Sequence, residues 1–262
     1  MKKWPILLGL GLAMLCLCGC EDLATRTARM EDLALLRVLA VDEKEGGISV
    51  TTTTGKAQQQ STLILHGYGM SLGEACLSAR EMGEAYPIYS YVDEILVGEA
   101  LAKQGLSGLL DHLERDVELR LSSRLWLLRG EAEKALTEDL AEGTVERLAM
   151  LAEMAGVGSN GLARTAGELI MAQDRSEDSF LPALELTEEG KLRSAGYGVL
   201  KEGRLVCYLE GDCAMGVSLM LEAQENEMIG LILDDGQRAS VRLGDVSCRF
   251  GGRFEGDRVV GL

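Results

Sequence analysis

Hydrophobic positions in the first third of the chain predict two paired strands and then a third. Residues 33–41 (LALLRVLAV) form a nearly continuous apolar run, which is typical of a buried strand. Residues 48–54 (ISVTTTT) are rich in β-branched side chains, which favour a strand. The polar turn at residues 42–47 predicts that these two segments pair as a hairpin. Residues 62–65 (TLIL) predict a further strand.

A helix is predicted directly after these strands. Ser71 is followed three residues later by Glu74, which is the pattern of a capping box that satisfies free amides at a helix start. Pro87 is expected to end the helix, because proline cannot continue one. The apolar side chains that recur at helical spacing and predict its buried face are Leu72, Ala75, Cys76, Ala79, Met82 and Tyr86.

The middle of the chain alternates predicted strands and helices. Strands are expected at residues 92–97 (VDEILV) and 124–128 (RLWLL). Ser107 is expected to cap a helix whose apolar face consists of Leu109, Leu110, Leu113, Val117 and Leu121. Further helices are predicted at residues 99–103, 131–140, 144–155 and 159–173.

After Pro182 the pattern changes to hairpins. Strands at residues 197–200 and 205–208 are predicted to pair, as are those at 228–233 and 239–243, and a last strand pair is expected within 254–260. Asp212 is expected to cap a short helix between the first two hairpins. The fold class predicted from this mixture is α+β, with mixed sheets, flanking helices and more than one domain.

The first residues match a bacterial lipoprotein signal. Lys2 and Lys3 precede an apolar run of 12 residues at 6–17, which is too short to span a bilayer and right for a signal-peptide core. Leu17 and Gly19 stand three and one residues before Cys20, which is the lipobox spacing. We therefore expect a signal peptide at residues 1–19 and a diacylglycerol on the Cys20 sulfur.

Charge limits the partners of this 262-residue chain. Its formal net charge is −16, and removal of Lys2 and Lys3 with the signal peptide would bring it to −18. An acidic protein is repelled by nucleic acid and by anionic lipid headgroups. We therefore expect no nucleic-acid binding, and we expect membrane attachment to come from the lipid.

The cysteines and histidines do not predict a metal site. Beyond the signal, four cysteines are scattered through the chain, and the two histidines, His66 and His112, stand far apart. No C-x-x-C pair occurs among them, so no metal or cofactor is expected. In a chain with a core this large, four scattered cysteines are expected to be small buried apolar residues. Because an exported chain can form disulfides, a Cys207–Cys213 disulfide is the alternative.

One stretch has the pattern of a catalytic motif. Residues 69–73 match G-x-S-x-G, with Ser71 between a predicted strand and a predicted helix, as a nucleophile elbow requires. Asp93, Asp111 and His112 follow, but a predicted mid-helix His112 is a poor general base. Gly67, Gly69 and Gly73 also resemble a dinucleotide loop, although the third glycine stands one position too late. The helix cap explains Ser71 completely, so no catalytic residue is expected.

A dense run of charges follows at residues 115–120. Asp116 and Arg120 stand four residues apart, which predicts a local ion pair on a solvated helix face.

The chain resembles the Ger(x)C family of spore germination lipoproteins in these segments. The similar residues are Ile95-Leu96-Val97-Gly98-Glu99, Leu109-Leu110-Asp111 and Arg115-Asp116-x-Glu118-x-Arg120, together with the lipobox and Ser179-Phe180-Leu181-Pro182. Glu21-Asp22 after the lipid cysteine departs from the family's usual Trp-Asp. The likeness implies an N-terminal α/β domain at residues 20–137 and a second domain, helices then a hairpin, at 138–225. Residues 226–262 resemble the start of a shortened C-terminal domain.

The resemblance also implies a function. It implies a non-enzymatic, lipid-anchored subunit of a nutrient germinant receptor, on the outer face of the spore inner membrane, that assembles with membrane-embedded A and B type subunits. A generic lipid-anchored ligand-binding protein, such as a transporter's capture subunit, is the alternative. Repeated βα units in both halves would favour that alternative, and residues after 174 do not show them.

Overall fold

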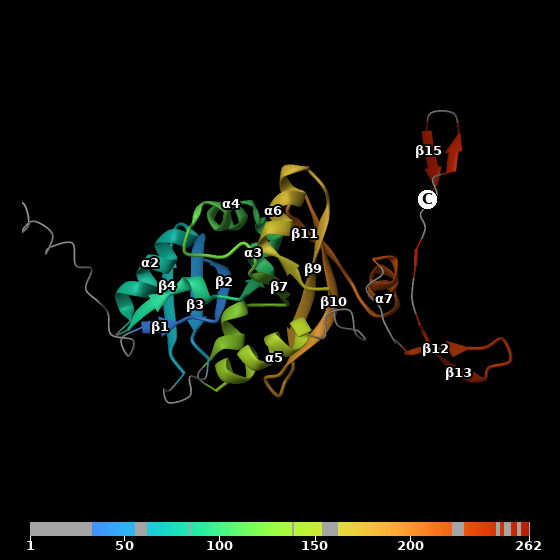
Figure 1. Ribbon diagram of the computed structural model, residues 1–262, viewed down its shortest axis with the longest axis horizontal. Helices are drawn as coiled ribbons and strands as arrows, with labels where there is room; N and C mark the ends of the chain where they lie inside the picture. The colour runs from blue at the N-terminus through green and yellow to red at the C-terminus, as the bar shows by residue number, and fades with distance from the viewer. Residues whose placement is uncertain are drawn as a thin grey trace, which may run out of the picture. The chain divides into compact units, whose positions relative to one another are not determined.

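A mixed β-sheet organises the chain (Figure 1). The computed structural model describes residues 33–55, 62–83, 85–137, 139–153, 162–221, 228–244, 247–248, 253–255 and 258–261. Nine strands form the sheet in the order β11-β10-β9-β7-β6-β2-β3-β4, with β8 paired to β7. They are β2 (Val38–Lys44), β3 (Gly47–Thr53), β4 (Ile64–Gly69), β6 (Glu94–Gly98), β7 (Arg124–Leu128), β8 (Arg164–Thr165), β9 (Ser179–Leu186), β10 (Leu192–Lys201) and β11 (Arg204–Leu209).

The centre of this sheet is parallel and buried on both faces. β2, β6, β7 and β9 run side by side in parallel register. Alternate side chains point to opposite faces of a strand, so Ile95 and Leu125 join one core cluster, while Leu96 and Trp126 join another. This two-sided burial explains why these strands are nearly continuous apolar runs in the sequence.

Helices cover the two faces. The first core cluster lies under α2 (Leu72–Met82), α3 (Glu99–Gln104), α4 (Ser107–Arg115) and α6 (Ala166–Asp174). The second lies under the 3₁₀ helix η3 (Ala132–Leu136) and α5 (Ala141–Glu153). Figure 1 shows α2, α4 and α6 on one side of the sheet and α5 on the other.

Smaller elements complete the described chain. β1 (Leu33–Leu35) pairs with β5 (Tyr86–Ile88), and the 3₁₀ helix η2 (Tyr89–Tyr91) follows. After β11 comes α7 (Gly211–Met220). Two further hairpins pair β12 (Met228–Ile232) with β13 (Arg238–Arg242) and β14 (Arg253–Glu255) with β15 (Arg258–Gly261).

The predicted fold class is confirmed: the structure contains mixed sheets with flanking helices. The first hairpin, β6 followed by α3, β7, and the β10–β11 and β12–β13 hairpins lie where the sequence predicted them. The large sheet contains strands from both sides of the expected domain boundary between residues 137 and 138, because β7 pairs with β8 and β9. The division at residues 137 and 225 stays a prediction.

Several predicted helix boundaries are wrong. α2 ends at Met82, before Pro87, and Tyr86 lies in β5 instead. α4 ends at Arg115, so Val117 and Leu121 are exposed rather than on its buried face. The predicted helix at 131–140 is only the short η3, and the one at 159–173 begins at Ala166, where Thr165 forms a full capping box with Glu168. Neither Ser107 nor Asp212 caps its helix, since these helices begin after Leu106 and Glu210.

Candidate functional site

Ser71 is a helix cap in the structure. Its Oγ accepts a hydrogen bond of 3.3 Å from the Glu74 amide at the start of α2. The second bond of the predicted capping box is displaced by one residue, because Glu74 accepts from the Met70 amide at 2.8 Å rather than from that of Ser71. Two amides at this helix start are therefore satisfied, and capping alone accounts for a serine at this position.

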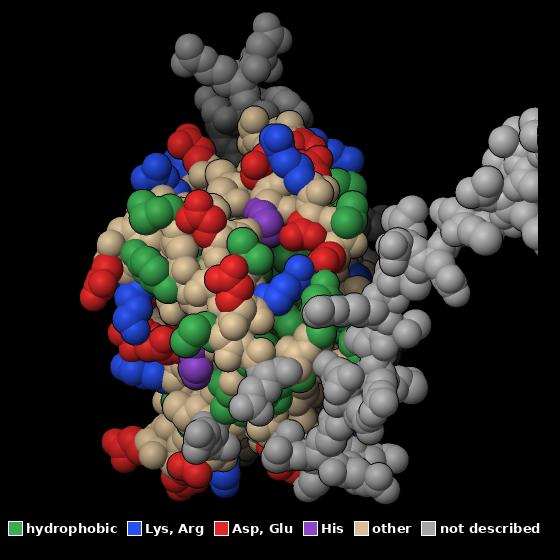
Figure 2. Space-filling view, turned by 90° about the vertical axis from the view of Figure 1, so that its left-hand side faces the viewer, with side chains coloured by type: hydrophobic (Ala, Val, Ile, Leu, Met, Phe, Trp, Pro, Cys, Tyr) green, Lys and Arg blue, Asp and Glu red, His purple; other side chains and the backbone are tan. Residues whose placement is uncertain are grey.

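Two of the remaining residues of the catalytic pattern, Asp111 and His112, lie near Ser71 but do not form a triad with it, and Asp93 pairs with Arg37 and Arg120 instead. Ser71, Asp111 and His112 line one hollow of about 410 Å³. Asp111 pairs with Arg115 at 2.7 Å, and His112 Nε2 lies 3.1 Å from the Asp116 carboxylate. His66 is exposed on β4, with Nδ1 3.0 Å from the Thr51 hydroxyl. Both histidines are visible in Figure 2, among hydrophobic, acidic and basic side chains.

The glycines that resemble a dinucleotide loop are packing positions. Gly67 and Gly69 lie in β4, directly against α2. A Cβ atom on Gly67 would lie 2.0 Å from the Ala75 carbonyl oxygen, and one on Gly69 would lie 2.4 Å from the Glu74 Cβ. These residues therefore let the helix approach the strand closely, which requires glycine.

Two buried carboxylates that no sequence motif predicted, Asp42 and Glu94, lie on the central strands of the sheet and accept hydrogen bonds there. Asp42, after the apolar part of β2, accepts hydrogen bonds from the amides of Ala132 (2.7 Å) and Glu133 (2.8 Å) at the start of η3. Burial raises the pKa of Asp42 above its ordinary value, and the two amide bonds oppose that rise. A Cβ atom on Gly98 would lie 1.9 Å from the Asp42 Oδ1. Asp42 is therefore the reason for the glycine in Ile95-Leu96-Val97-Gly98-Glu99.

Glu94 is the second buried carboxylate, and its side chain is almost fully enclosed at the start of β6. Arg124 Nε donates to both of its oxygens, at 3.0 and 3.1 Å, and Trp126 Nε1 donates to Oε2 at 2.7 Å. The parallel register of β6 and β7 pairs Glu94 with Arg124. The Glu94 hydrogen bond raises the pKa of Arg124 further above its already high value. An acidic residue inside an apolar strand was the sequence signal for such a buried polar contact.

The charged run at residues 115–120 does not contain the predicted Asp116–Arg120 pair. Arg120 instead lies 3.1 Å from Asp93, and Glu118 lies 2.6 Å from Arg80 on α2. Because α4 ends at Arg115, residues 116–120 lack the helical spacing that would bring Asp116 and Arg120 together. Residues 116–121, which we call the 116–121 loop, are thus tied to α2, to α4 and to Asp93 just before β6.

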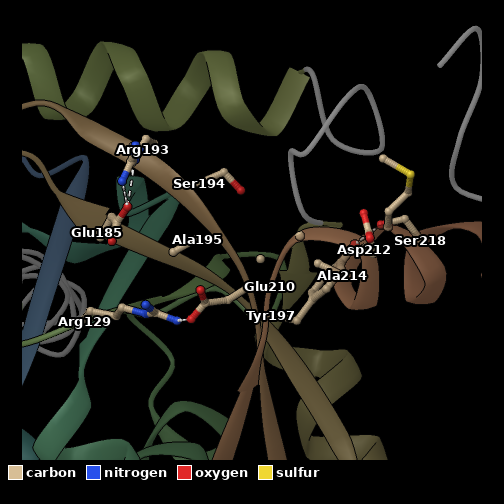
Figure 3. Close-up of a pocket in the computed structure, with 13 residues that line it drawn as sticks. Arg129, Glu185, Arg193, Ser194, Ala195, Tyr197, Glu210, Asp212, Ala214 and Ser218 are labelled. Atoms are coloured by element: carbon tan, nitrogen blue, oxygen red, sulfur yellow. Dashed lines mark hydrogen bonds and ion pairs between the residues drawn. The ribbon is translucent and has the colours of Figure 1, made fainter. Parts of the chain in front are cut away.

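A polar hollow of about 420 Å³ lies between β9, β10 and the start of α7 (Figure 3). Arg193 faces Glu185 and Arg129 faces Glu210 across it, as the dashed lines show. Tyr197 and Ser218 close its α7 side, with their hydroxyls 2.7 Å apart. The register of β10 with β9 shifts between Ser194 and Tyr197, which opens the sheet edge here. Since both arginines are paired with carboxylates, the hollow suits a small neutral polar ligand better than an ion.

The four cysteines among the described residues, Cys76, Cys207, Cys213 and Cys248, are free thiols. Cys207 and Cys213, the pair left open as a disulfide, are both exposed and unbridged, so the expectation of buried cysteine side chains is wrong for these two residues. Burial raises the pKa of Cys76 to about 12, so this thiol stays protonated at neutral pH and is a poor nucleophile. Cys20 lies outside the described residues, and its lipidation stays a prediction.

Among the described residues, no three His, Cys, Asp or Glu side chains are grouped so that they could hold a metal ion. Every helix that the structure describes is too short or too polar to cross a bilayer.

Comparison with known proteins assigns the family. The profile described as Spore germination protein N-terminal domain matches residues 27–186. Spore germination protein B3 of Bacillus subtilis (strain 168) is 29% identical over 218 residues, which cover 76% of this chain and 56% of that protein. The crystal structure of the GerBC protein shares the fold with a TM-score of 0.51 at 19% identity, and the match covers 83% of this chain and 66% of that one. The chain thus spans less than two thirds of both relatives. It belongs to the Ger(x)C family of spore germination proteins.

Proposed function

We propose that this chain is the lipid-anchored subunit of a spore nutrient germinant receptor. It works by assembly with membrane-embedded subunits of the A and B types, and not by turning over a substrate. The family match over residues 27–186 carries this proposal. The similarity to a spore germination protein of Bacillus subtilis supports it.

The contacts of the chemically suggestive side chains favour an assembly role. Ser71 caps α2, Asp42 holds the start of η3, and Glu94 joins Arg124 and Trp126. Each of these groups therefore has a structural task that accounts for it. A subunit that transmits or stabilises a receptor state needs a rigid scaffold of this kind, and it needs no nucleophile.

The lipid on Cys20 supplies the attachment that the acidic chain cannot obtain from headgroups. Confinement to the membrane surface raises the local concentration of an embedded partner, so even a weak protein contact becomes occupied. The exposed charges then steer the encounter more than they hold the complex. Loss of the lipid should weaken the response that depends on assembly.

The proposal is tested in a spore former that carries this gene. Deletion should abolish the response to one set of nutrients and leave growth and sporulation intact. Cys20→Ala should weaken the same response and lose labelling by an alkyne fatty acid, whereas Cys18→Ala should keep both. Normal germination of the deletion strain on every nutrient, with no membrane subunit recovered by crosslinking, would leave the lipid-anchored capture protein as the better assignment.

A further inference from the structure

The 116–121 loop holds one apolar side chain in water on a rigid support. Val117 is 97% exposed, the highest value among the large hydrophobic side chains of the described residues. Its neighbours are fixed: Asp116 Oδ1 accepts from the Glu118 amide at 2.7 Å, and Leu119 is buried in the core. Glu118 and Arg120 are tied to Arg80 and Asp93. The loop is therefore ordered before any partner binds, which lowers the entropy cost of binding.

Further apolar and aromatic side chains continue from Val117 onto one surface. Leu77 of α2 is 53% exposed and lines the same groove of about 300 Å³ as Val117. The Arg80 guanidinium carbon lies 5.1 Å from the centre of the exposed Tyr86 ring, and that of Arg120 lies 6.0 Å from the Tyr91 ring. We call these six residues the docking surface: Leu77, Arg80, Tyr86, Tyr91, Val117 and Arg120.

The composition of the docking surface fits a protein partner. Tyrosine and arginine are the residues enriched at the energetic centres of protein interfaces, and charges there must be paired to be buried at low cost. Both arginines already have carboxylate partners, Glu118 and Asp93. The surface can therefore be covered without leaving an arginine charge unpaired.

Charge decides which partner it fits. The chain carries a net charge of −16, which disfavours an anionic headgroup layer. The carboxylates of Asp116 and Glu118 line the groove beside Val117, and they favour a protein with lysine or arginine at the edge of its contact. Tyr86 lies in β5, which pairs with β1, and β1 begins at Leu33, thirteen residues after Cys20. Thirteen residues reach at most about 45 Å. A lipid on Cys20 therefore keeps the docking surface close to membrane-embedded proteins.

We propose that the docking surface binds an extracytoplasmic apolar segment, flanked by basic residues, of a membrane-embedded receptor subunit, with Val117 inserted at its centre. This inference rests on the proposed receptor function and names the face that the assembly uses. No other residue of the surface is as exposed as Val117 and as independent of the core, so its replacement tests the contact without disturbing the fold.

A photo-crosslinking residue, p-benzoyl-phenylalanine, is introduced at position 117 or, as a control, at position 206 of the full-length lipoprotein in spores. Val206 is 56% exposed on β11, the strand at the other edge of the sheet. Position 117 should crosslink to a membrane-embedded germination protein encoded beside this gene, and position 206 should not. Crosslinks only to lipid, only to a second copy of this chain, or equally from both positions would overturn the proposal.

Introduction of positive charge into the surface gives a second readout. Val117→Lys with Leu77→Lys repels a basic partner and should lower recovery of the membrane subunit by about tenfold, as expected for the loss of one interface centre. Val206→Lys should leave recovery unchanged, and the melting temperature and membrane content of all variants should match the wild type. If deletion of the gene abolishes germination while the double variant germinates normally, the docking surface is not the contact with the membrane subunit, and the receptor function stands. If deletion has no effect, the receptor function itself fails.

Discussion

The parallel centre of the large sheet and the separate antiparallel β12–β13 hairpin are both held by regular backbone hydrogen bonds, yet their side chains are in different environments. In the centre, Ile95, Leu96 and Trp126 are almost completely buried between two layers of helices. In the hairpin, Ile232 is 77% exposed, and Val241 is exposed as well. The backbone pairing is regular in both places.

The difference shows what holds this fold together. Folding replaces hydrogen bonds to water by hydrogen bonds within the protein, so each one adds only about 1 kcal/mol to the free energy of unfolding. Burial of a large apolar side chain adds about 1.5–3 kcal/mol. An isolated two-stranded hairpin is marginally stable in water for the same reason. We therefore expect the stability of the described chain to depend on the parallel centre and hardly at all on the hairpin.

Trp126→Ala should give the largest effect. Trp126 is 1% exposed, packs in the cluster under η3 and α5, and donates its indole N–H to Glu94. Its truncation should lower the free energy of unfolding by about 3–5 kcal/mol, as large-to-small changes in cores do. Denaturant unfolding followed by circular dichroism measures this loss. A loss below about 1 kcal/mol would mean that the centre is not the stabilising region.

Glu94→Ala should give the second largest loss of unfolding free energy. The change leaves the Arg124 guanidinium and the Trp126 indole N–H without their acceptor. We expect a loss of about 2–3 kcal/mol, below the ~3–5 kcal/mol of a fully buried pair, because Arg124 is partly exposed to solvent. The neighbouring Asp93→Ala breaks only exposed pairs with Arg37 and Arg120, and it should cost about 1 kcal/mol or less. Equal losses in the two variants would contradict the importance of burial.

Ser71→Ala should cost less, because α2 covers the sheet near its β4 edge and the change removes one capping bond. The expected loss is about 1 kcal/mol, and Ser71→Thr should lose much less because threonine also caps. A fluorophosphonate probe should leave the wild type unlabelled. Covalent labelling that disappears in Ser71→Ala would show that the serine is a nucleophile.

The hairpin should give the smallest effect. Ile232→Ala removes a side chain that is mostly in water, so the free energy of unfolding should change by less than about 0.5 kcal/mol. Amides of β12 and β13 should exchange with deuterium faster than those of β2 (Val38–Lys44), since local opening requires no loss of burial. Equal protection of the two segments, measured by mass spectrometry, would mean that something covers the hairpin.

The sequence by itself determined the elements whose signal is local. Neighbouring residues decide the positions of the apolar strands β2, β6 and β7, of the β12–β13 hairpin and of the cap at Ser71, so these could be predicted. The resemblance that named the family rests on the same local segments, and Gly98 within it is explained by the close approach of Asp42.

Only the tertiary structure decided which distant residues meet. β9 was missed, because a strand that begins at Ser179 and contains Pro182 shows its place only beside β7. Asp116 and Arg120 could pair only on a continuous helix, but α4 ends at Arg115. Asp116 therefore lies beside His112, and Arg120 pairs with Asp93. The partners of Asp42 and Glu94 lie 90 and 30 residues further along the chain. Side-chain partners across such separations follow from the packing of strands and helices, which no local pattern records.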